Sequence, residues 1–258
     1  MGLYLKYCVI NIKSQIQYKL SFFFVILAQF LSAFTVFFSV YFMFTFFNAV
    51  DGFTYAQVLL CFASVGMAFS IAELVSSGFA VFSIMIGNGA FDRILVRPQG
   101  AIFQVLASRM DLARLGLLAQ SVIILWWAIP NSGVMWSWAR ILTLCLMVVC
   151  GSVIFSCLFL IQASFAFFTT EGVEFMNLLT YGGREHGRYP YSIYGKNVLR
   201  FLTFVIPLAL FQYYPLLFLL GRENSVLYMI TPILGLLFLI PSYAFFRFGL
   251  RKYKSTGS

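Results

Sequence analysis

Charge is scarce in this chain, and acidic charge is the scarcest. Only 10% of the 258 residues are charged, with 8 acidic residues and one histidine. A soluble domain of this length needs far more polar surface to cover its core, so a soluble fold is excluded. The histidine, His186, has no partner at metal-ligand spacing, and the five cysteines match no zinc or iron–sulfur pattern. The sequence therefore predicts no catalytic, cofactor-binding or metal-binding residue in this chain.

Two signals of known transport mechanisms are also missing. The chain has no G-x-x-x-x-G-K-[ST] phosphate-binding loop, so no ATPase site of that kind is expected in it. Ion-driven transporters usually hold several ionisable groups at mid-membrane, and here the apolar runs hold almost none. Glu73 is the exception, expected near the inner membrane boundary. Glu73 either has a structural role, in which it pairs with a loop arginine or snorkels to inner water, or it marks a substrate route. The structural role is preferred.

Apolar residues dominate instead. They make up 62% of the chain, with 32 phenylalanines and a mean hydropathy of +0.93. Repeated runs of 18 or more residues are long enough to cross a hydrocarbon layer of ~30 Å as helices. The first run is too long for a cleavable signal peptide, so we expect it to remain as a span. The sequence thus predicts one all-α, polytopic membrane domain (1–258) with six transmembrane helices, near 22–47, 55–82, 112–129, 141–163, 198–220 and 226–246.

Residues 1–20 precede the first span and have helical periodicity. One stripe of this segment is apolar and comprises Leu5, Cys8, Val9, Ile12 and Ile16. The opposite side is polar and comprises Lys6, Lys13 and Gln17. This pattern predicts an amphipathic helix in the membrane interface rather than a frayed basic terminus.

The positions of Lys and Arg predict the orientation. With the N-terminus inside, only Arg140 and Arg222 lie outside, so both termini are expected in the cytoplasm. The net charge of +9 then indicates topology and attraction to anionic lipids rather than nucleic-acid binding. The expected cytoplasmic parts are the connections 84–110 and 164–197 and the tail 248–258. Glu171, Glu174, His186 and the basic residues Arg184, Arg188, Lys196 and Arg200 are all expected on the cytoplasmic side.

The stretch NGAFDRILVRPQG, residues 88–100, concentrates charge between two apolar runs. Phe91, Ile94 and Leu95 alternate with Asp92, Arg93 and Arg97 at helical spacing, and Gly89 and Pro98 bracket the turn. A short helix with an apolar face and a charged face is suited to a groove on another protein. An ordinary positive-inside loop explains the arginines, but not the apolar face, the aspartate or the bracketing residues.

The fifth span carries two prolines, Pro207 and Pro215. Because proline breaks or kinks a helix, we expect an interruption before the outer surface. Irregular backbone at membrane depth must be covered by protein or water, which favours an interior position. The segment Gln212, Tyr213, Tyr214 and Pro215 is expected to begin a short re-entrant element, and we assign it with Pro207 and Glu73 to a pathway or subunit interface.

Three segments of the chain resemble those of a known family. Residues 88–100 are similar to the G-x-L-D-x-x-L-x-[RK]-P element of type-2 ABC-transporter permeases, in the subgroup of small six-span permeases. Residues 188–221 (RYPYSIYGKNVLRFLTFVIPLALFQYYPLLFLLG) and the closing LRKYKSTGS provide two further matches in the same order. Phe91 departs from the leucine that is more frequent in the family. The resemblance covers nearly the whole chain.

The resemblance implies a permease of a bacterial ABC exporter with a type V-like fold, in the cytoplasmic membrane. Such a permease is not itself an enzyme: two copies of a separate ATPase subunit bind ATP and magnesium, and a second permease, identical or similar, completes the unit. The ATPase-coupling residues would be Gly89, Phe91, Asp92, Arg93, Ile94, Leu95, Arg97 and Pro98.

Two other classes of function remain open from the residues. An ion-coupled secondary transporter is disfavoured by the lack of intramembrane ionisable groups. A non-transporting membrane scaffold is disfavoured by the kinked fifth span and the charged loop helix. A phenylalanine-rich first span suits an amphiphilic, lipid-like or antibiotic-like substrate, although lipid-facing phenylalanine requires no function.

Overall fold

The computed structural model describes residues 2–47, 49–169 and 174–255. The described residues form helices joined by turns, and their β-structure is one isolated bridge between Val50 and Phe53. The all-α prediction is therefore confirmed. The helices are α1 (Gly2–Ile16), α2 (Lys19–Phe46), α3 (Tyr55–Ala80), α4 (Phe82–Gly87), α5 (Ala90–Leu95), α6 (Ala101–Ser108), α7 (Arg114–Asn131), α8 (Trp138–Phe165), α9 (Phe175–Leu179), α10 (Tyr181–His186), η1 (Tyr191–Tyr194), α11 (Lys196–Phe204), α12 (Leu208–Leu219), α13 (Val226–Gly235), η2 (Leu236–Phe238) and α14 (Leu239–Lys252).

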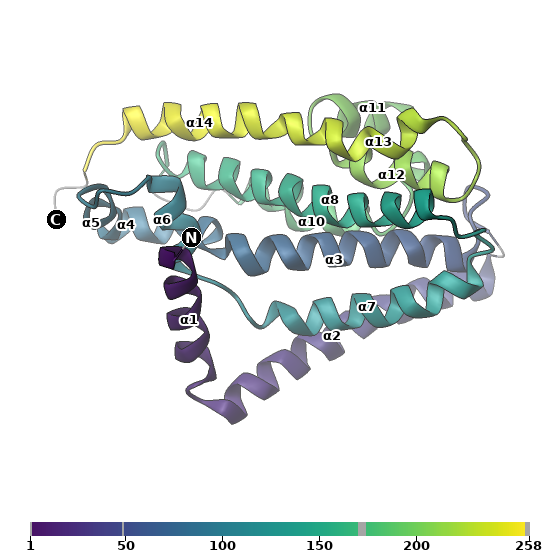
Figure 1. Cartoon of the computed structure of the whole chain (residues 1–258), viewed down its shortest axis with the longest axis horizontal. Coiled ribbons are helices and arrows are strands. Elements are labelled where there is room, and N and C mark those ends of the chain that lie inside the picture. The colour runs from purple at the N-terminus through teal and green to yellow at the C-terminus, as the bar shows by residue number, and fades with distance from the viewer. Residues whose placement is uncertain (1, 48, 170–173, 256–258) are drawn as a thin grey trace.

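The long helices α3, α7, α8 and α14 lie side by side, α2 runs obliquely to them, and the molecule has two distinct ends (Figure 1). We call the end with α4, α5, α6 and residues 253–255 the tail end, and the end with the connections 49–54, 132–137 and 220–225 the loop end. Contacts join the loop-end connections: Arg222 donates to the carbonyl of Gly52 and lies 3.8 Å from the ring centroid of Phe53. The helix α1 begins near the tail end, and α14 ends there (Figure 1).

Four helical stretches are long and apolar enough to cross a membrane. They are Lys19–Phe46, Tyr55–Gly87, Trp138–Phe165 and Val226–Lys252, and the pair α11–α12 supplies a fifth candidate with a bend of 113°. The helix α7, of 18 residues, lies along α3 in the same bundle (Figure 1). The described residues thus show a multi-pass membrane protein with four or five membrane-capable stretches, and the prediction of six crossings stays a prediction.

The bend in the fifth candidate occurs where proline predicts it. The helix α11 ends at Phe204, and α12 begins after Pro207. Proline has no N–H to continue the ladder and its ring clashes with the preceding turn, which explains the interruption. Pro215, in contrast, lies inside α12. The expectation that Gln212 begins a separate element is wrong, because Gln212 lies inside α12, which begins at Leu208.

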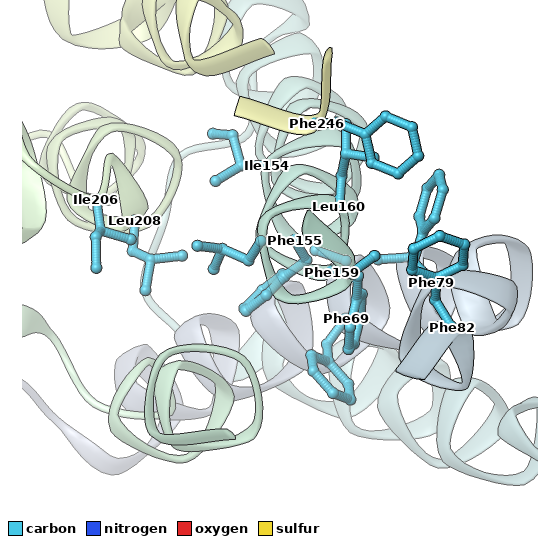
Figure 2. Packing of buried hydrophobic residues seen from close by; sticks show 14 of the residues in the cluster. Phe69, Phe79, Phe82, Ile154, Phe155, Phe159, Leu160, Ile206, Leu208 and Phe246 are labelled. Carbon is cyan, nitrogen blue, oxygen red and sulfur yellow. The ribbon is translucent and has the colours of Figure 1, made fainter. Parts of the chain in front are cut away.

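Aromatic packing at the centre of the bundle joins α3 to α8. Phe69 and Phe155 meet edge to face with ring centroids 5.2 Å apart, and Phe159 lies 5.9 Å from Phe69. Figure 2 shows these rings at the centre, with Ile206 and Leu208 on one side of them. Edge-to-face pairs add about 0.5–1.5 kcal/mol each beyond the burial of their area. The helix α3 is consequently the central element: in the stretch Tyr55–Gly87, which it begins, 78% of an apolar run of 18 residues is buried.

The first span, α2, is held more loosely. Only 6% of its apolar run of 18 residues is buried. Its close contact is with α7, where a Cβ on Gly116 would overlap the carbonyl oxygen of Ile26 and lie 3.0 Å from the amide nitrogen of Phe30. Small residues allow such backbone approach between helices in a membrane. Most of α2 is therefore left for lipid or for another chain to cover.

Candidate functional site

The charged segment 88–100 lies at the tail end, as a sharp turn followed by the short helix α5. Gly89 has a φ of 68°, in the left-handed region that glycine adopts without strain. The side-chain oxygen of Asn88 accepts a hydrogen bond from the amide of Ala90 at 3.0 Å. The helix ends at Leu95, before Pro98, and residues 95–100 are exposed. The segment is thus a defined protrusion.

The apolar face of α5 points into this chain rather than outward. Phe91 is fully buried, with ring centroids 4.9 Å from Phe82, 5.6 Å from Phe167 and 5.2 Å from Tyr253. Ile94 is buried as well. The expectation that these two residues offer an apolar knob to a partner is not what the structure shows, because the chain's own core encloses them. The outward surface comprises Arg93, Leu95, Val96, Arg97 and Pro98.

Asp92 binds the C-terminal tail. Its two carboxylate oxygens accept hydrogen bonds from the hydroxyl groups of Tyr253, at 2.9 Å, and Ser255, at 2.7 Å. Burial, followed by the adjacent Asp92, raises the pKa of Tyr253 to about 12, so the phenol stays protonated and donates at neutral pH. Asp92 therefore connects the segment 88–100 to the end of α14, which leaves less of its charge for a partner.

Two further contacts fix the turn after α5. The amide of Gln104, on α6, donates to the carbonyl oxygens of Ile94 at 3.2 Å and Gln99 at 2.9 Å. Arg97 donates to the hydroxyl of Tyr7 on α1 at 3.2 Å. The sequence gives little sign of the role of Gln104, apart from one amide in an otherwise apolar helix. The segment is held from α6, from α1 and from the tail.

Gly78 allows α6 to pack directly against α3. A Cβ at this position would overlap the backbone carbonyl of Val105, and backbone cannot swing aside as a side chain can. We expect Gly78→Ala to displace α6, to lower stability by roughly 1–3 kcal/mol, and to weaken any partner bound at residues 88–100. Gly87→Ala is the matched control, because its Cβ would have nothing within 4 Å. Equal thermal unfolding midpoints for the two variants would show that Gly78 does not position α6.

Glu73 forms an ion pair at the tail-end third of α3. Its Oε1 lies 2.8 Å from Nη2 of Arg114, at the start of α7, and accepts a hydrogen bond from Tyr181 at 2.8 Å. Arg114 also contacts Asp111 at 3.1 Å. The carboxylate of Glu73 is 3% exposed. The interpretation of Glu73 as the partner of a loop arginine matches this geometry, while its assignment to a pathway or interface stays a prediction.

The N-terminal helix α1 is attached to the same region. It lies across the direction of the long helices (Figure 1). Gln15 donates to the carbonyl of Met110 at 2.5 Å and accepts from the amide of Leu112 at 3.1 Å, while Asn11 donates to Ala107 at 3.2 Å. Val9, Ile10 and Ile16 are exposed. Leu5 lies outside the residues whose side chains are described. A crosswise helix with exposed apolar side chains has the form that an interfacial position requires, and that position stays a prediction.

Residues 181–194 follow a path that the sequence does not predict. Tyr181 bonds Glu73, Arg184 lies 4.8 Å from the ring centroid of Phe69, and Arg188 lies 5.2 Å from that of Phe62. Residues 181–188 therefore run along the middle of α3, from Glu73 to Phe62. At 1.5 Å per residue, Phe62 and Glu73 each lie ~10 Å from an end of that helix.

This path corrects the expectation for the second connection. Residues 164–197 do not all lie at the tail end, because polar partners inside the bundle hold the chain there. Within this connection Glu185 pairs with Arg184, whose Nε lies 2.9 Å from it, and with Arg188. These pairs satisfy charges that otherwise favour a loop in water. Glu174 precedes α9, and Glu171 lies outside the described residues.

Gln212 holds residues 187–189 in place. Fully buried on α12, it donates to the carbonyl oxygens of Gly187 at 3.2 Å and Tyr189 at 2.8 Å. Tyr213 is half-buried, and Tyr214 shares a hydrogen bond with Thr203 at 3.1 Å. Pro207 and Pro215 are buried. The assignment of this group to a pathway or interface stays a prediction, and Gln212 has a visible structural role.

Comparison with known proteins supplies the family. The family model described as ABC-2 family transporter protein matches residues 30–257. No curated protein and no solved structure gives a significant match to the chain. The match begins inside α2 and includes the segment 88–100, the break at Pro207 and the tail. The chain belongs to the ABC-2 family of transporter proteins.

Proposed function

We propose that this chain is the permease subunit of an ATP-driven exporter, which moves an amphiphilic substrate outward with a separate ATPase subunit. The ATPase subunits bind ATP and magnesium, and this chain does not catalyse the hydrolysis. The observation that carries the proposal is the outward face of residues 88–100. Arg93, Leu95, Val96 and Arg97 are exposed on a protrusion that the chain's own core supports from behind.

The working unit in this proposal contains two permease chains and two ATPase subunits. The described residues of one chain offer a single protrusion of this kind, whereas ATP hydrolysis by such subunits uses a pair. The loosely held α2 leaves a long apolar surface that a second, identical or similar, permease covers in part. The broken span α11–α12 lies near the junction of the two permeases, because irregular backbone at depth needs protein or water beside it.

The chain crosses the bacterial cytoplasmic membrane six times in this proposal, with α7 and α11–α12 as crossings and both termini inside. Support comes from the basic residues of the tail end, which outnumber Arg140 and Arg222 at the loop end.

Cysteine labelling of intact cells tests this topology. We expect an impermeant maleimide to label Asn131→Cys directly and Lys254→Cys only after permeabilisation, in a chain with Cys8 and Cys145 replaced by serine. Both positions are exposed, whereas Ser132 is 4% exposed and makes a poor probe. Direct labelling at residue 254 contradicts the orientation.

Affinity purification tests the function itself. The full-length tagged chain, extracted gently from its own membranes, is expected to bring with it a protein that carries a phosphate-binding loop and hydrolyses ATP. If no such protein co-purifies and the purified chain supports proton- or sodium-driven flux, the function is secondary transport. If neither an ATPase nor flux is found, a scaffold function replaces the proposal.

A further inference from the structure

A cavity of about 370 Å³ lies where α9, α10, η1, α11 and α12 meet. This volume is within the usual range of small-molecule sites. The apolar part of its wall comprises Leu178, Leu179, Val198, Phe201, Leu202 and Leu208. The cavity is thus enclosed by one continuous stretch of the chain, from α9 to the start of α12.

One part of this wall is buried and another part is exposed. Leu202 and Leu208 are buried, whereas Leu178, Val198 and Phe201 are exposed. On α11, Val198 lies on the same face as Phe201 and Leu202, at spacings of three and four residues. The cavity therefore has an apolar rim, through which an apolar molecule can enter from outside the chain.

Two residues of α10 place the cavity beside the middle of α3. Gly183 and His186 both line it, and both belong to residues 181–188, which run along α3 from Glu73 to Phe62. In the proposed topology α3 crosses the membrane, so the rim lies at membrane depth. A ligand would then reach the cavity from the bilayer.

Three polar side chains complete the wall, those of His186, Tyr191 and Tyr194. Nδ1 of His186 contacts the carbonyl oxygen of Gly182 at 2.7 Å. The hydroxyl group of Tyr194 donates to the carbonyl oxygen of His186 at 3.0 Å, and that of Tyr191 donates to the carbonyl oxygen of Gly183 at 3.4 Å. Because a carbonyl oxygen only accepts, Nδ1 of His186 also acts as a donor here.

The donors of these side chains are thus used within the chain, and acceptors remain for the cavity. With the proton on Nδ1, Nε2 of the neutral imidazole carries a lone pair. The two phenol oxygens keep acceptor capacity as well. Tyr191 is fully buried and His186 is exposed, so we assign Nε2 of His186 to a ligand that enters through the rim.

The wall offers no partner to a charged headgroup. The described residues that line the cavity include no lysine, arginine, aspartate or glutamate. Glu185, next to His186 in the chain, pairs with Arg184 and Arg188. Burying a charge without a partner is costly, above all at membrane depth. The cavity therefore suits an uncharged ligand that donates a hydrogen bond.

We infer that this cavity binds the hydroxyl end of a neutral amphiphile from the bilayer. The hydroxyl group donates to Nε2 of His186, and the adjoining apolar part lies against Val198 and Phe201. The inference rests on the proposed function and names the substrate class, a long-chain molecule with a free hydroxyl group. An uncharged ligand needs no ionic partner at this depth, which matches a wall of apolar groups and acceptors.

Photo-cross-linking to the permease alone tests this site. The full-length chain in phosphatidylcholine nanodiscs is irradiated with a diazirine-bearing decanol, and the adduct is expected within residues 178–208 by peptide mass spectrometry. Displacement of the cross-link by 1-decanol, decyl methyl ether or decylammonium gives an apparent Kd for each, at pH 8, where imidazole is neutral and the ammonium is charged. We expect 1-decanol to bind about threefold to tenfold more tightly than either competitor, which is the value of one neutral hydrogen bond.

Two substitutions of His186 isolate the hydrogen bond. His186→Phe keeps a ring but has no acceptor, so this variant is expected to bind the alcohol and the ether equally, with its affinity for the ether unchanged. His186→Gln provides an acceptor oxygen and should keep the preference for the alcohol. Because a merely structural role of His186 would alter the binding of both ligands alike, the ratio of the two Kd values is the decisive readout.

A third substitution tests the location. Val198→Trp places a larger side chain at the rim and should weaken the binding of both ligands at least about tenfold, since a close-packed site cannot hold both the side chain and the ligand. Val149→Trp is the matched control, because Val149 is an exposed valine on α8 outside the cavity wall. If Val198→Trp does not fold, the adduct position and the His186 pair still decide the matter.

Several results would overturn the inference. They are equal binding of the alcohol and the ether by the unmodified chain, tighter binding of the ammonium, an alcohol preference that persists in His186→Phe, or an adduct outside residues 178–208. None of these measurements uses ATP or an ATPase. Co-purification of an ATPase without an alcohol preference would leave the proposed function in place and remove only this site. An alcohol preference without an ATPase would keep the site and remove its role in ATP-driven export.

Discussion

A permease with Arg93→Glu and Val96→Glu is expected to lose at least ~100-fold of its affinity for the ATPase subunit while it folds and inserts normally. Val96 is 84% exposed, and Arg93 is exposed beside it. The two glutamates would place carboxylates in a contact that we propose is formed by a cation and an apolar side chain, and burying an unpaired charge is costly. Because both side chains point away from the core, the fold should be spared.

The control for this variant changes charge at the same end of the molecule. Lys6→Glu with Lys13→Glu introduces two glutamates on α1, whose lysines are exposed. We expect this control to retain ATPase binding within about threefold, since rim charges contribute little. The measurement is the apparent Kd of purified permease for its ATPase, at 0.15 M salt. Equal binding by the Arg93/Val96 variant and the wild-type chain would remove the coupling assignment.

Arg114→Ala is expected to destabilise the permease by about 3–5 kcal/mol, the largest effect of any single substitution we consider. Glu73 would keep a carboxylate that is 3% exposed and would lose its cationic partner at 2.8 Å. The hydrogen bond from Tyr181 compensates only part of that charge. Loss of the pair also loosens the contact of α7 with α3, on which α2 depends.

A variant that lacks both charges separates the effect of this ion pair from that of general packing. Glu73→Leu with Arg114→Leu removes both charges and is expected to be more stable than Arg114→Ala, because no unpaired charge remains. Arg109→Ala, an exposed arginine at the same end, should change stability by less than about 0.5 kcal/mol. The readout is reversible unfolding in mixed micelles. A double variant no more stable than Arg114→Ala would mean that the ion pair does not account for the loss.

Much of the fold was predictable from the sequence because the bilayer restricts what a chain can do. An apolar run of sufficient length must form a helix, which fixed the positions of α2, α3 and α8 to within a few residues. The break near Pro207 was predictable for a similar reason, since proline cannot continue the ladder of backbone hydrogen bonds. These features depend on local chemistry alone.

The path of residues 181–194 was not predictable in this way. Arg184, Glu185 and Arg188 have the composition of a cytoplasmic loop, and the positive-inside rule assigns such residues to the inner side. Inside the bundle they satisfy one another, and Gln212 supplies donors from a helix that begins later in the chain. Such mutual satisfaction between distant residues leaves no periodic signal in the sequence.

The segment 88–100 shows a second limit. An apolar stripe on a short helix indicates that something covers it, but the stripe does not distinguish a partner from the chain itself. Phe91 is covered by α4 and by residues after α8 and α14, and Ile94 is buried beside it, whereas Leu95 and Val96 are exposed. Asp92, expected to contact a partner, binds the tail through Tyr253. The structure narrows the proposed coupling surface to its outer edge.

The mass of the intact complex in detergent tests the central claim most directly. Each permease chain contributes 29.3 kDa. The full-length tagged chain, isolated with its bound ATPase and measured by native mass spectrometry, is expected to give two permease chains with two ATPase subunits. The Arg93→Glu, Val96→Glu variant should give a permease species without ATPase. A single permease chain bound to a catalytically active ATPase, or an unchanged complex in that variant, would contradict the account.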